Sequence, residues 1–220
     1  MKLHKIYQLL PLSIREQFRN LQEFLQRKDM IKFHSQFIKP KDLVFDIGAN
    51  IGNYAKIYKS LGAKVVCLEP QPYCISKLKK RFENDKNITI VEKGVAEKIS
   101  ELELNLDSNN HATATFSQQF KEDGPFNDRT WEKKIKVSVT TLDELIKQYG
   151  LPSYCKIDVE GYEYSVLKGL SKPIKYISFE YSKSLLDLVE KCIKHLEELG
   201  KPMYNYCEYN RPTKFKLDTW

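Results

Sequence analysis

The sequence LVFDIGANIG, which starts at Leu43, limits the fold of this chain more than any other stretch. It begins as a mostly apolar run that contains Asp46, and it ends in a turn bracketed by Gly48 and Gly52. A continuous apolar run followed by turn residues is typical of a strand that is covered on both faces. The apolar spacing over 54–61 then predicts a helix, so the stretch indicates a strand, a tight turn and a helix in succession.

A second apolar run, 64–68, predicts another strand and is followed by Glu69, which lies 21 positions after Gly48. In dinucleotide-binding folds an acidic residue about 20 positions after the glycine-rich turn binds the ribose hydroxyls. A turn that binds a pyrophosphate also needs a central glycine, and this position is Asn50. The turn therefore favours S-adenosylmethionine, which carries no phosphate, over NAD. The alternative is an ordinary strand-to-helix turn of an α/β protein.

Length and composition indicate one folded α/β domain. The chain has 220 residues, of which 41% are hydrophobic, and no apolar run approaches the roughly 20 residues that a bilayer span needs. The apolar patch 6–12 is not followed by a small-residue cleavage site, so we expect no secretory signal. The five cysteines form no CxxC pair, and Cys67 and Cys155 fall in predicted strands as buried thiols. This usage predicts a reducing compartment and a cytoplasmic protein.

The basic charge of the chain is concentrated at its N-terminus. The net charge is +7, and residues 1–40 hold eight Lys or Arg against three acidic residues. A capping box from Ser13 to Glu16 starts a helical pattern there, and Pro40 ends it. We therefore divide the chain into an N-terminal helical extension, 1–40, and a main domain, 41–220. The basic extension is either a solvated helix face or a contact for nucleic acid, a phosphorylated sugar carrier or a membrane surface.

The rest of the main domain continues the alternation of strands and helices. Apolar runs or alternating patterns predict strands at 88–91, 102–106, 135–139, 154–157 and 176–180, a terminal hairpin at 203–209 and 214–217, and helices between them. The segment 107–134 is polar and has little periodicity, so we interpret it as a lid over the site or as a disordered insertion.

Acidic side chains gather where two of these strands end. Asp158, Glu160 and Glu163 follow the strand 154–157, and Glu180 closes the next strand. Like charges clustered at one edge of a sheet are costly unless they are paired or bind something. We therefore expect some of these carboxylates to face a ligand.

Five blocks in order, DIGANIGNY, CLEPQP, TLDEL, KIDVEGYEYSVLKG and ISFEYS, resemble the FkbM family of S-adenosylmethionine-dependent methyltransferases over about residues 40 to 182. The resemblance implies the α/β fold of the class I methyltransferases, which is Rossmann-like. Its sheet is mostly parallel and seven-stranded, with helices on both faces and an antiparallel last strand. The sequence GVAE at 94–97 departs from the family's more usual Asn-x-Ala pattern.

The resemblance also assigns the residues that would bind the cofactor. The segment 92–96 leaves the third strand where contacts with the adenine edge usually lie. The expected cofactor-binding residues are Asp46, Gly48, Asn50, Gly52 and Asn53 in the turn, Glu69 at the ribose with the adjoining Pro70, and Val95 near the adenine.

The function implied by the resemblance is O-methyl transfer to a hydroxyl of a saccharide, glycoconjugate or related natural product. Asp158 and Glu160 are the candidates for the base that takes the hydroxyl proton, or for orienting the acceptor. His111, in the candidate lid, is a third candidate base. In a metal-assisted alternative, Asp158, Glu160 and Glu180 would hold Mg²⁺ or Ca²⁺ through oxygen ligands.

Two alternatives come from other classes of protein. An RNA-binding protein or RNA methyltransferase would use the basic N-terminal region. The chain lacks an Asn/Asp-Pro-Pro-aromatic tetrapeptide and a basic platform of aromatic residues, so we expect a small-molecule or glycan acceptor rather than nucleic acid. The second alternative is a binding protein that keeps the cofactor pocket without catalysis.

Overall fold

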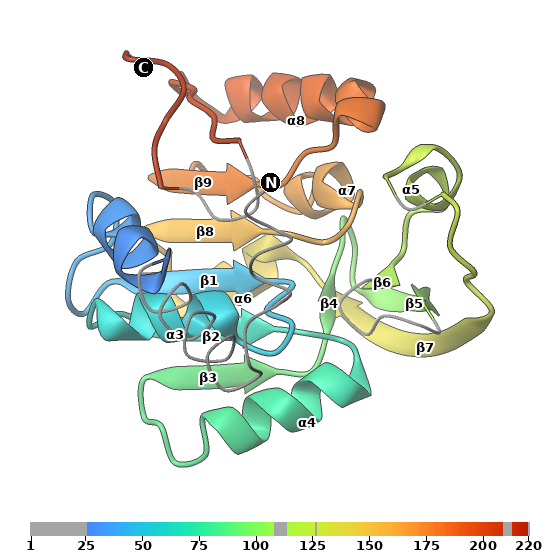
Figure 1. Cartoon of the computed structure of the whole chain (residues 1–220), viewed down its shortest axis with the longest axis horizontal. Coiled ribbons are helices and arrows are strands. Elements are labelled where there is room, and N and C mark those ends of the chain that lie inside the picture. Colours follow the sequence, from blue (N-terminus) through green and yellow to red (C-terminus); the bar gives the residue numbers. More distant parts are fainter. Residues whose placement is uncertain (1–25, 108–113, 126, 209–212, 220) are drawn as a thin grey trace, which may run out of the picture. The chain divides into compact units, whose positions relative to one another are not determined.

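The computed structural model describes residues 26–107, 114–125, 127–208 and 213–219 (Figure 1). The chain divides into two compact units, of which the larger is Phe37–Tyr204 and the smaller combines Met1–Gln36 with Asn205–Trp220. The pocket and the contacts of the candidate site lie within the larger unit. The boundary that the sequence predicts after residue 40 stays a prediction.

The larger unit alternates strands and helices, as the sequence predicts (Figure 1). Its strands are β1 (Leu43–Ile47), β2 (Lys64–Leu68), β3 (Ile88–Val91), β4 (Gly94–Val95), β5 (Ser100–Leu106), β6 (Ala114–Thr115), β7 (Lys133–Thr140), β8 (Tyr154–Ile157) and β9 (Tyr176–Phe179). Its helices are α3 (Asn53–Ser60), α4 (Pro72–Arg81), α5 (Gln118–Asp123), α6 (Leu142–Tyr149), α7 (Glu163–Leu167), the 3-10 turn η1 (Lys183–Leu185) and α8 (Leu186–Leu199).

The central sheet has five strands in the order β3-β2-β1-β8-β9, and every neighbouring pair is parallel. The mostly parallel α/β sheet is therefore confirmed. Strands β1, β2 and β8 are buried along almost their whole length, as strands with helices on both faces must be. The strand order reverses between β1 and β8, and ligands of open α/β sheets bind outside the carboxyl ends at such a point.

Successive residues of each strand point to opposite faces of this sheet. On one face Phe45 and Ile47 belong to the main core, together with residues of α6, α7 and α8. On the other face Tyr154 contacts Tyr58 of α3, with ring centroids 5.6 Å apart. The two apolar layers hold the sheet in place and leave its carboxyl edge to form a site.

A second sheet of four strands, in the order β4-β7-β5-β6, lies beside the first (Figure 1). The strands predicted at 102–106 and 135–139 belong to it, so the described residues do not form the single seven-stranded sheet that the resemblance implies. The physical reason is that β5 and β7 keep alternate residues exposed, whereas a strand inside the parallel sheet needs both faces covered.

The predicted terminal hairpin is not formed by the residues that the structure describes. No strand is assigned in 203–208 or 213–217, although the Lys216 N–H donates to the Tyr206 carbonyl at 2.9 Å. The two segments are joined by the side chain of Asn205 instead of by a ladder of backbone hydrogen bonds. The side-chain oxygen of Asn205 accepts from the Leu217 N–H at 3.1 Å, and its nitrogen donates to the Leu217 carbonyl at 3.0 Å.

Most of the predicted N-terminal extension lies outside the described residues. Of the part that is described, residues 26–34 are helical. Throughout the described ranges, every helix is too short or too polar to cross a bilayer. All five cysteines are described, and none forms a disulfide. Cys67 and Cys155 are buried in strands, as predicted.

The turn after β1 is pressed against the end of β8. Gly48 has a φ of 78°, and a Cβ built on it would come within 1.8 Å of the Asp158 carbonyl oxygen. Its own N–H donates to the Leu68 carbonyl at 3.0 Å, which fixes the turn to the end of β2 as well. Only glycine fits here, because both the backbone conformation and the space exclude a side chain.

We expect Gly48→Ala to lower the free energy of unfolding by about 3 kcal/mol or more, since it adds a backbone overlap to the strain of a positive φ. Gly62→Ala is the matched control, because Gly62 has a φ of 84° but its Cβ would meet Pro40 only at 3.2 Å. It should cost about 1 to 2 kcal/mol. Denaturant unfolding of the two variants measures the difference, and equal losses would show that the close approach does not constrain the fold.

Candidate active site

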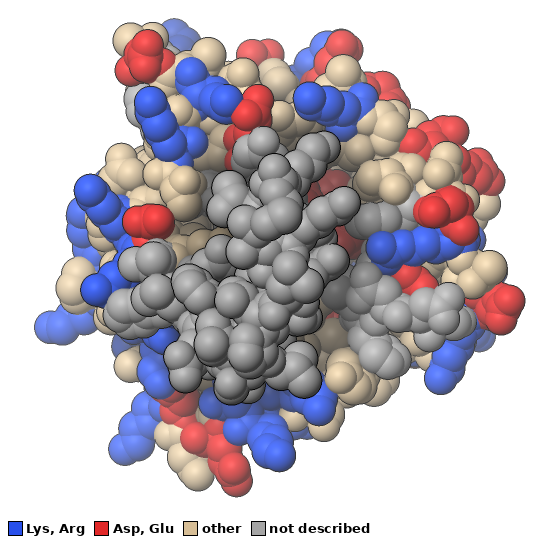
Figure 2. All heavy atoms as spheres, in the orientation of Figure 1, with Lys and Arg blue, Asp and Glu red and all other residues tan. Residues whose placement is uncertain are grey.

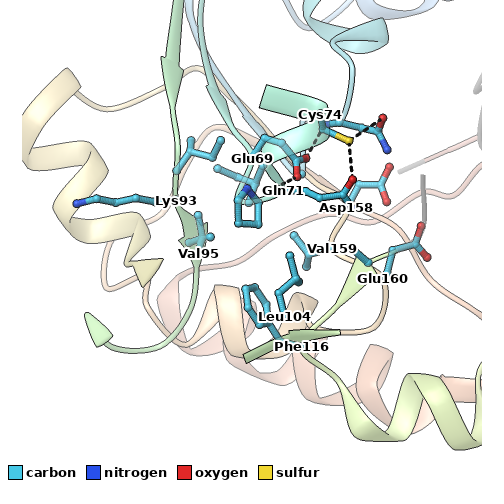
Figure 3. Close-up of a pocket in the computed structure, with 17 residues that line it drawn as sticks. Glu69, Gln71, Cys74, Lys93, Val95, Leu104, Phe116, Asp158, Val159 and Glu160 are labelled. Atoms are coloured by element: carbon cyan, nitrogen blue, oxygen red, sulfur yellow. Dashed lines mark hydrogen bonds between the residues drawn. The ribbon is translucent and has the colours of Figure 1, made fainter. Parts of the chain in front are cut away.

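A pocket of about 650 Å³, which includes space open to solvent, lies at the carboxyl edge of the central sheet (Figure 3). Seven of the residues that the sequence singles out line it: Gly48, Asn50, Glu69, Pro70, Val95, Asp158 and Glu160. The structure therefore brings together most of the predicted cofactor residues and both predicted carboxylate bases.

Glu69 connects two segments that line this pocket, the turn after β1 and the start of α4. One carboxylate oxygen accepts from the Asn50 N–H at 2.8 Å and the other from the Gln71 N–H at 2.9 Å. Burial raises the pKa of Glu69 to about 7, although these two bonds favour the charged form. The carboxylate thus fixes the turn after β1 to the start of α4, and it still lines the pocket. Its contact with a ribose stays a prediction.

Three residues predicted in the cofactor turn do not line the pocket. A Cβ on Gly52 would meet the ring of Phe82 at 2.5 Å, so this glycine permits packing against the end of α4. Asn53 accepts a hydrogen bond from Arg81 at 2.8 Å at an exposed position. Asp46 is wholly buried in β1. A role of these residues in shaping the turn stays a prediction, but the pocket surface does not include them.

Asp46 is an unusual buried acid. Neither of its carboxylate oxygens has a hydrogen-bond partner among the described residues. Burial raises the pKa of Asp46 to about 6, although the charge of Lys156 and the nearby N–H of Ala55 favour the ionised form. Lys156 is its register neighbour on β8. The ionised form of Asp46 is therefore costly, and Lys156 offsets only part of that cost.

Lys156 was not predicted, and it is the main cation of the site. Its Nζ lies 2.7 Å from an oxygen of Asp158 and 4.3 Å from the centroid of the Tyr54 ring. Burial alone would raise the pKa of Asp158, but Lys156 and a hydrogen bond with Glu180 hold it below its usual range. A lysine inside the otherwise apolar strand YCKI was a signal that sequence reasoning did not use.

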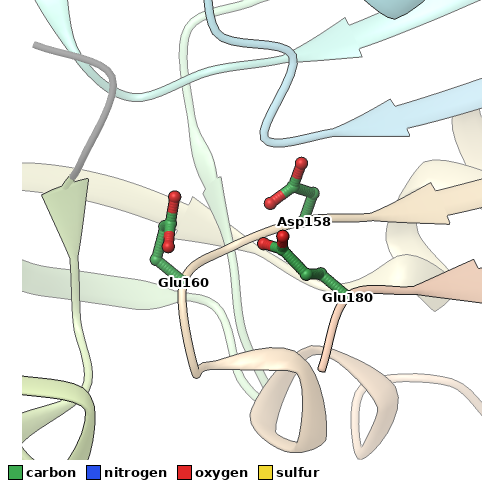
Figure 4. Close-up of side chains that lie close together, drawn as sticks. All are labelled: Asp158, Glu160 and Glu180. Atoms are coloured by element: carbon green, nitrogen blue, oxygen red, sulfur yellow. The ribbon is translucent and has the colours of Figure 1, made fainter. Parts of the chain in front are cut away.

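Asp158, Glu160 and Glu180 form a carboxylate cluster at the carboxyl ends of β8 and β9 (Figure 4). One oxygen of each lies within 4.8 Å of the others, so the fold brings these three side chains together. Burial and the charge of Asp158 raise the pKa of Glu160 to about 8. They also raise the pKa of Glu180. At neutral pH the cluster therefore holds an ionised Asp158 beside carboxyl groups that retain protons.

Glu163 is the fourth of the acidic residues that follow β8 and β9, and its side chain faces the backbone instead of the carboxylate cluster. One of its oxygens accepts from the Val159 N–H at 3.1 Å and from the Gly161 N–H at 3.3 Å. Burial raises the pKa of Glu163 to about 7. The Glu163 side chain thus holds the backbone of the turn after β8. Of the four acidic residues, it is not one that we expect to contact a ligand.

The candidate lid, 107–134, contributes to the pocket through its described part. It contains the short strand β6 and the helix α5, so it is not a structureless loop. Phe116, which follows β6, and Leu104 of β5 line the pocket near Val159 and Val95 and give it an apolar wall (Figure 3). Neither was predicted. His111 lies outside the described residues, so its role as a base and the closing of a lid stay predictions.

The chain matches proteins that transfer methyl groups. Residues 46–203 match the model of the methyltransferase FkbM domain. The hexuronic acid methyltransferase AglP of Haloferax volcanii is 24% identical over 166 residues, which are 74% of this chain and 64% of that protein. The chain therefore spans less than two thirds of the length of this relative.

Two solved structures resemble the chain at low identity. The precorrin-6y C5,15-methyltransferase of Geobacter metallireducens has a TM-score of 0.49 at 14% identity, over 82% of this chain and 73% of that one. A putative rRNA methylase of Clostridium thermocellum has a TM-score of 0.45 at 11% identity, over 83% of this chain and 88% of that one.

The buried Asp46 predicts how stability depends on pH. Burial raises the pKa of Asp46 from its ordinary value of 3.8 to about 6 in the folded chain, so the stability that it contributes is present below pH 3.8 and is lost as the pH rises through about 6. We expect Asp46→Asn, which cannot ionise, to gain about 3 kcal/mol relative to wild type over this window.

Denaturant unfolding of the cofactor-free proteins at several pH values measures this gain. Asp128→Asn is the matched control, because Asp128 is exposed, and it should follow the wild-type pH dependence. A constant difference between Asp46→Asn and wild type across the window would contradict the prediction.

Proposed function

The chain belongs to the methyltransferase FkbM family, and from this premise we propose that it transfers a methyl group from S-adenosylmethionine to a hydroxyl oxygen of a saccharide or glycoconjugate. The observation that carries the proposal is the shared pocket: Gly48 and Glu69 line one side, and Asp158 and Glu160 line another. Methyl transfer needs a site for the nucleoside donor and a site for the hydroxyl acceptor next to each other, and the two sides of this pocket would provide them.

The nucleoside side of the pocket fits the cofactor in three respects. The turn after β1 lines it with Gly48 and Asn50, and Gly48 lets this turn lie directly against the end of β8. Glu69 offers a buried carboxylate for ribose hydroxyls, and Val95, Leu104 and Phe116 offer an apolar surface for an adenine ring. When bound, S-adenosylmethionine supplies a methyl group that its sulfonium charge already activates. The chain then has to orient the acceptor and remove one proton.

The carboxylate cluster is suited to that task. Asp158 is kept ionised by Lys156, so it can accept or orient a hydroxyl proton at neutral pH. Glu160 becomes a base as the pH rises through about 8. A neutral hydroxyl enters beside these carboxylates at a lower electrostatic cost than an anionic acceptor group.

A saccharide acceptor is supported by the relative from Haloferax volcanii, which is a hexuronic acid methyltransferase. RNA is a poorer candidate, because its phosphates would be repelled by the cluster. Over the described part of the surface in view, acidic and basic side chains are intermingled rather than gathered into one basic patch (Figure 2). The basic residues 1–25, on which the RNA alternative depends, lie outside the described residues.

The second candidate is a metal-assisted form of the same reaction. The spacing of Asp158, Glu160 and Glu180 favours it, since one oxygen from each lies within 4.8 Å of the others. Mg²⁺ or Ca²⁺ held by these oxygens would lower the pKa of a bound hydroxyl. Binding would displace the protons that Glu160 and Glu180 otherwise keep at neutral pH.

A screen of sugars, nucleotide sugars and glycolipids for release of S-adenosylhomocysteine tests the proposed function. We expect release with at least one hydroxyl-bearing saccharide. Release with RNA alone would transfer the assignment to the RNA alternative, and cofactor binding without release from any acceptor class would favour the binding-protein reading.

We expect Glu69→Gln to weaken S-adenosylmethionine binding by about 1.5 to 3 kcal/mol, which is the scale of hydrogen bonds to a charged group. Isothermal titration calorimetry measures the affinity, and NAD should give no measurable binding. Glu101→Gln, at an exposed position of β5, is the matched control and should bind like wild type. Unchanged affinity in Glu69→Gln would rule out the ribose contact.

Asp158→Asn and Glu160→Gln should lower turnover about 100-fold or more and change cofactor affinity little, because their proposed role is on the acceptor side. Turnover is measured with and without EDTA. Full activity in EDTA supports base catalysis, whereas loss that Mg²⁺ restores supports the metal-assisted form. If both variants keep near-normal turnover, the base assignment is wrong and His111 becomes the next residue to test.

A further inference from the structure

The turn that carries Glu160 has a backbone conformation that needs support. Glu160 has a φ of 54° and the following Gly161 a φ of 83°. A residue other than glycine in this left-handed region is uncommon, and such residues persist where the surrounding structure holds them. The contacts around the turn therefore decide where the Glu160 carboxylate lies.

Thr115 provides one of these contacts, from a different sheet. Its hydroxyl accepts a hydrogen bond from the Ser117 N–H at 2.8 Å and lies 2.7 Å from the Glu160 carbonyl oxygen. A carbonyl cannot donate, so the hydroxyl hydrogen must point to Glu160. Thr115 is 1% exposed, so water does not compete for this bond.

Thr115 is itself firmly held. The Asn105 amide nitrogen donates to the Thr115 carbonyl at 3.0 Å, and β5 pairs with β6 at this position. A few residues later Phe120 packs so closely on the turn that a Cβ on Gly161 would come within 2.7 Å of its side chain. The segment 114–120 thus supports the turn from one side, and Glu163 supports it from the other.

We propose that Thr115 is a positioning residue, whose hydroxyl holds the Glu160 carbonyl and so keeps the Glu160 carboxylate beside Asp158 and Glu180 (Figure 4). The role of Glu160 in catalysis rests on the proposed function. Its placement by Thr115 does not, and the two can be tested separately.

Thr115→Val keeps the shape of the side chain and removes both the donor to the Glu160 carbonyl and the acceptor of the Ser117 N–H, so Glu160 should leave the cluster for part of the time. We expect kcat to fall about tenfold, as for the loss of one buried hydrogen bond, while the Kd of S-adenosylmethionine stays within about twofold. Thr115→Ser keeps the hydroxyl and should restore most of the activity. Thr130→Val makes the same chemical change at an exposed threonine of the candidate lid, 107–134, and should behave like wild type.

A titration of glutamate side-chain carboxyl carbons by ¹³C NMR provides a readout that does not depend on turnover. Glu160→Gln identifies the resonance of Glu160. In wild type this carboxyl should titrate near pH 8, and in Thr115→Val its midpoint should move toward the ordinary value of 4.5 as the carboxylate leaves its buried position and the charge of Asp158. Thr115→Ala replaces the valine variant if that one does not fold.

An unchanged Glu160 midpoint in the folded variant overturns the positioning role, whatever the activity. If wild type shows no methyl transfer to any acceptor but the midpoint moves as expected, the proposed function fails and the positioning role stands. A tenfold loss of kcat in Thr115→Ser would also overturn the proposal, because the hydroxyl would then not be the group that matters.

Discussion

The contact between the turn after β1 and the end of β8 is the constraint on which the rest of the site depends. Gly48 can lie against the Asp158 carbonyl because it has no side chain, and a Cβ would not fit in the space between them. This contact brings the part of the pocket that Glu69 lines next to the part that Glu160 lines. It forms where the strand order reverses, which is the one point along the edge where neighbouring loops diverge and leave a crevice.

The electrostatics of the site follow from having more buried acids than buried cations. Lys156 lies between Asp46 and Asp158, and it keeps Asp158 ionised. At Glu160 and Glu180 the charge of Lys156 is too weak to offset burial and the charge of Asp158, which raise their pKa values. One cation thus divides the acids into an ionised group and proton-retaining groups, and such a division is what acid–base chemistry requires.

Several elements were predictable because local sequence determines them. The runs at 64–68, 88–91 and 154–157 became strands with the predicted bounds. Thr141 caps α6 through the Glu144 N–H, as its capping-box pattern indicates. The second sheet was not foreseen, because alternating strands show only that one face is exposed and do not show which partner covers the other. Asp46 illustrates the same limit, since its neighbour Lys156 is 110 positions away along the chain.

By itself the sequence determined the α/β alternation, the glycine turn and the acids that close β2, β8 and β9, because periodicity, turn chemistry and strand ends are local properties. Tertiary structure alone decided which of those acids share a cluster, which one caps a turn, and which residue balances their charge. Glu160 and Glu163 are three positions apart, yet one faces the pocket and the other the backbone. The reason is that the conformation of the turn is set by contacts from β6 and α5, and no pattern within the turn's own sequence encodes them.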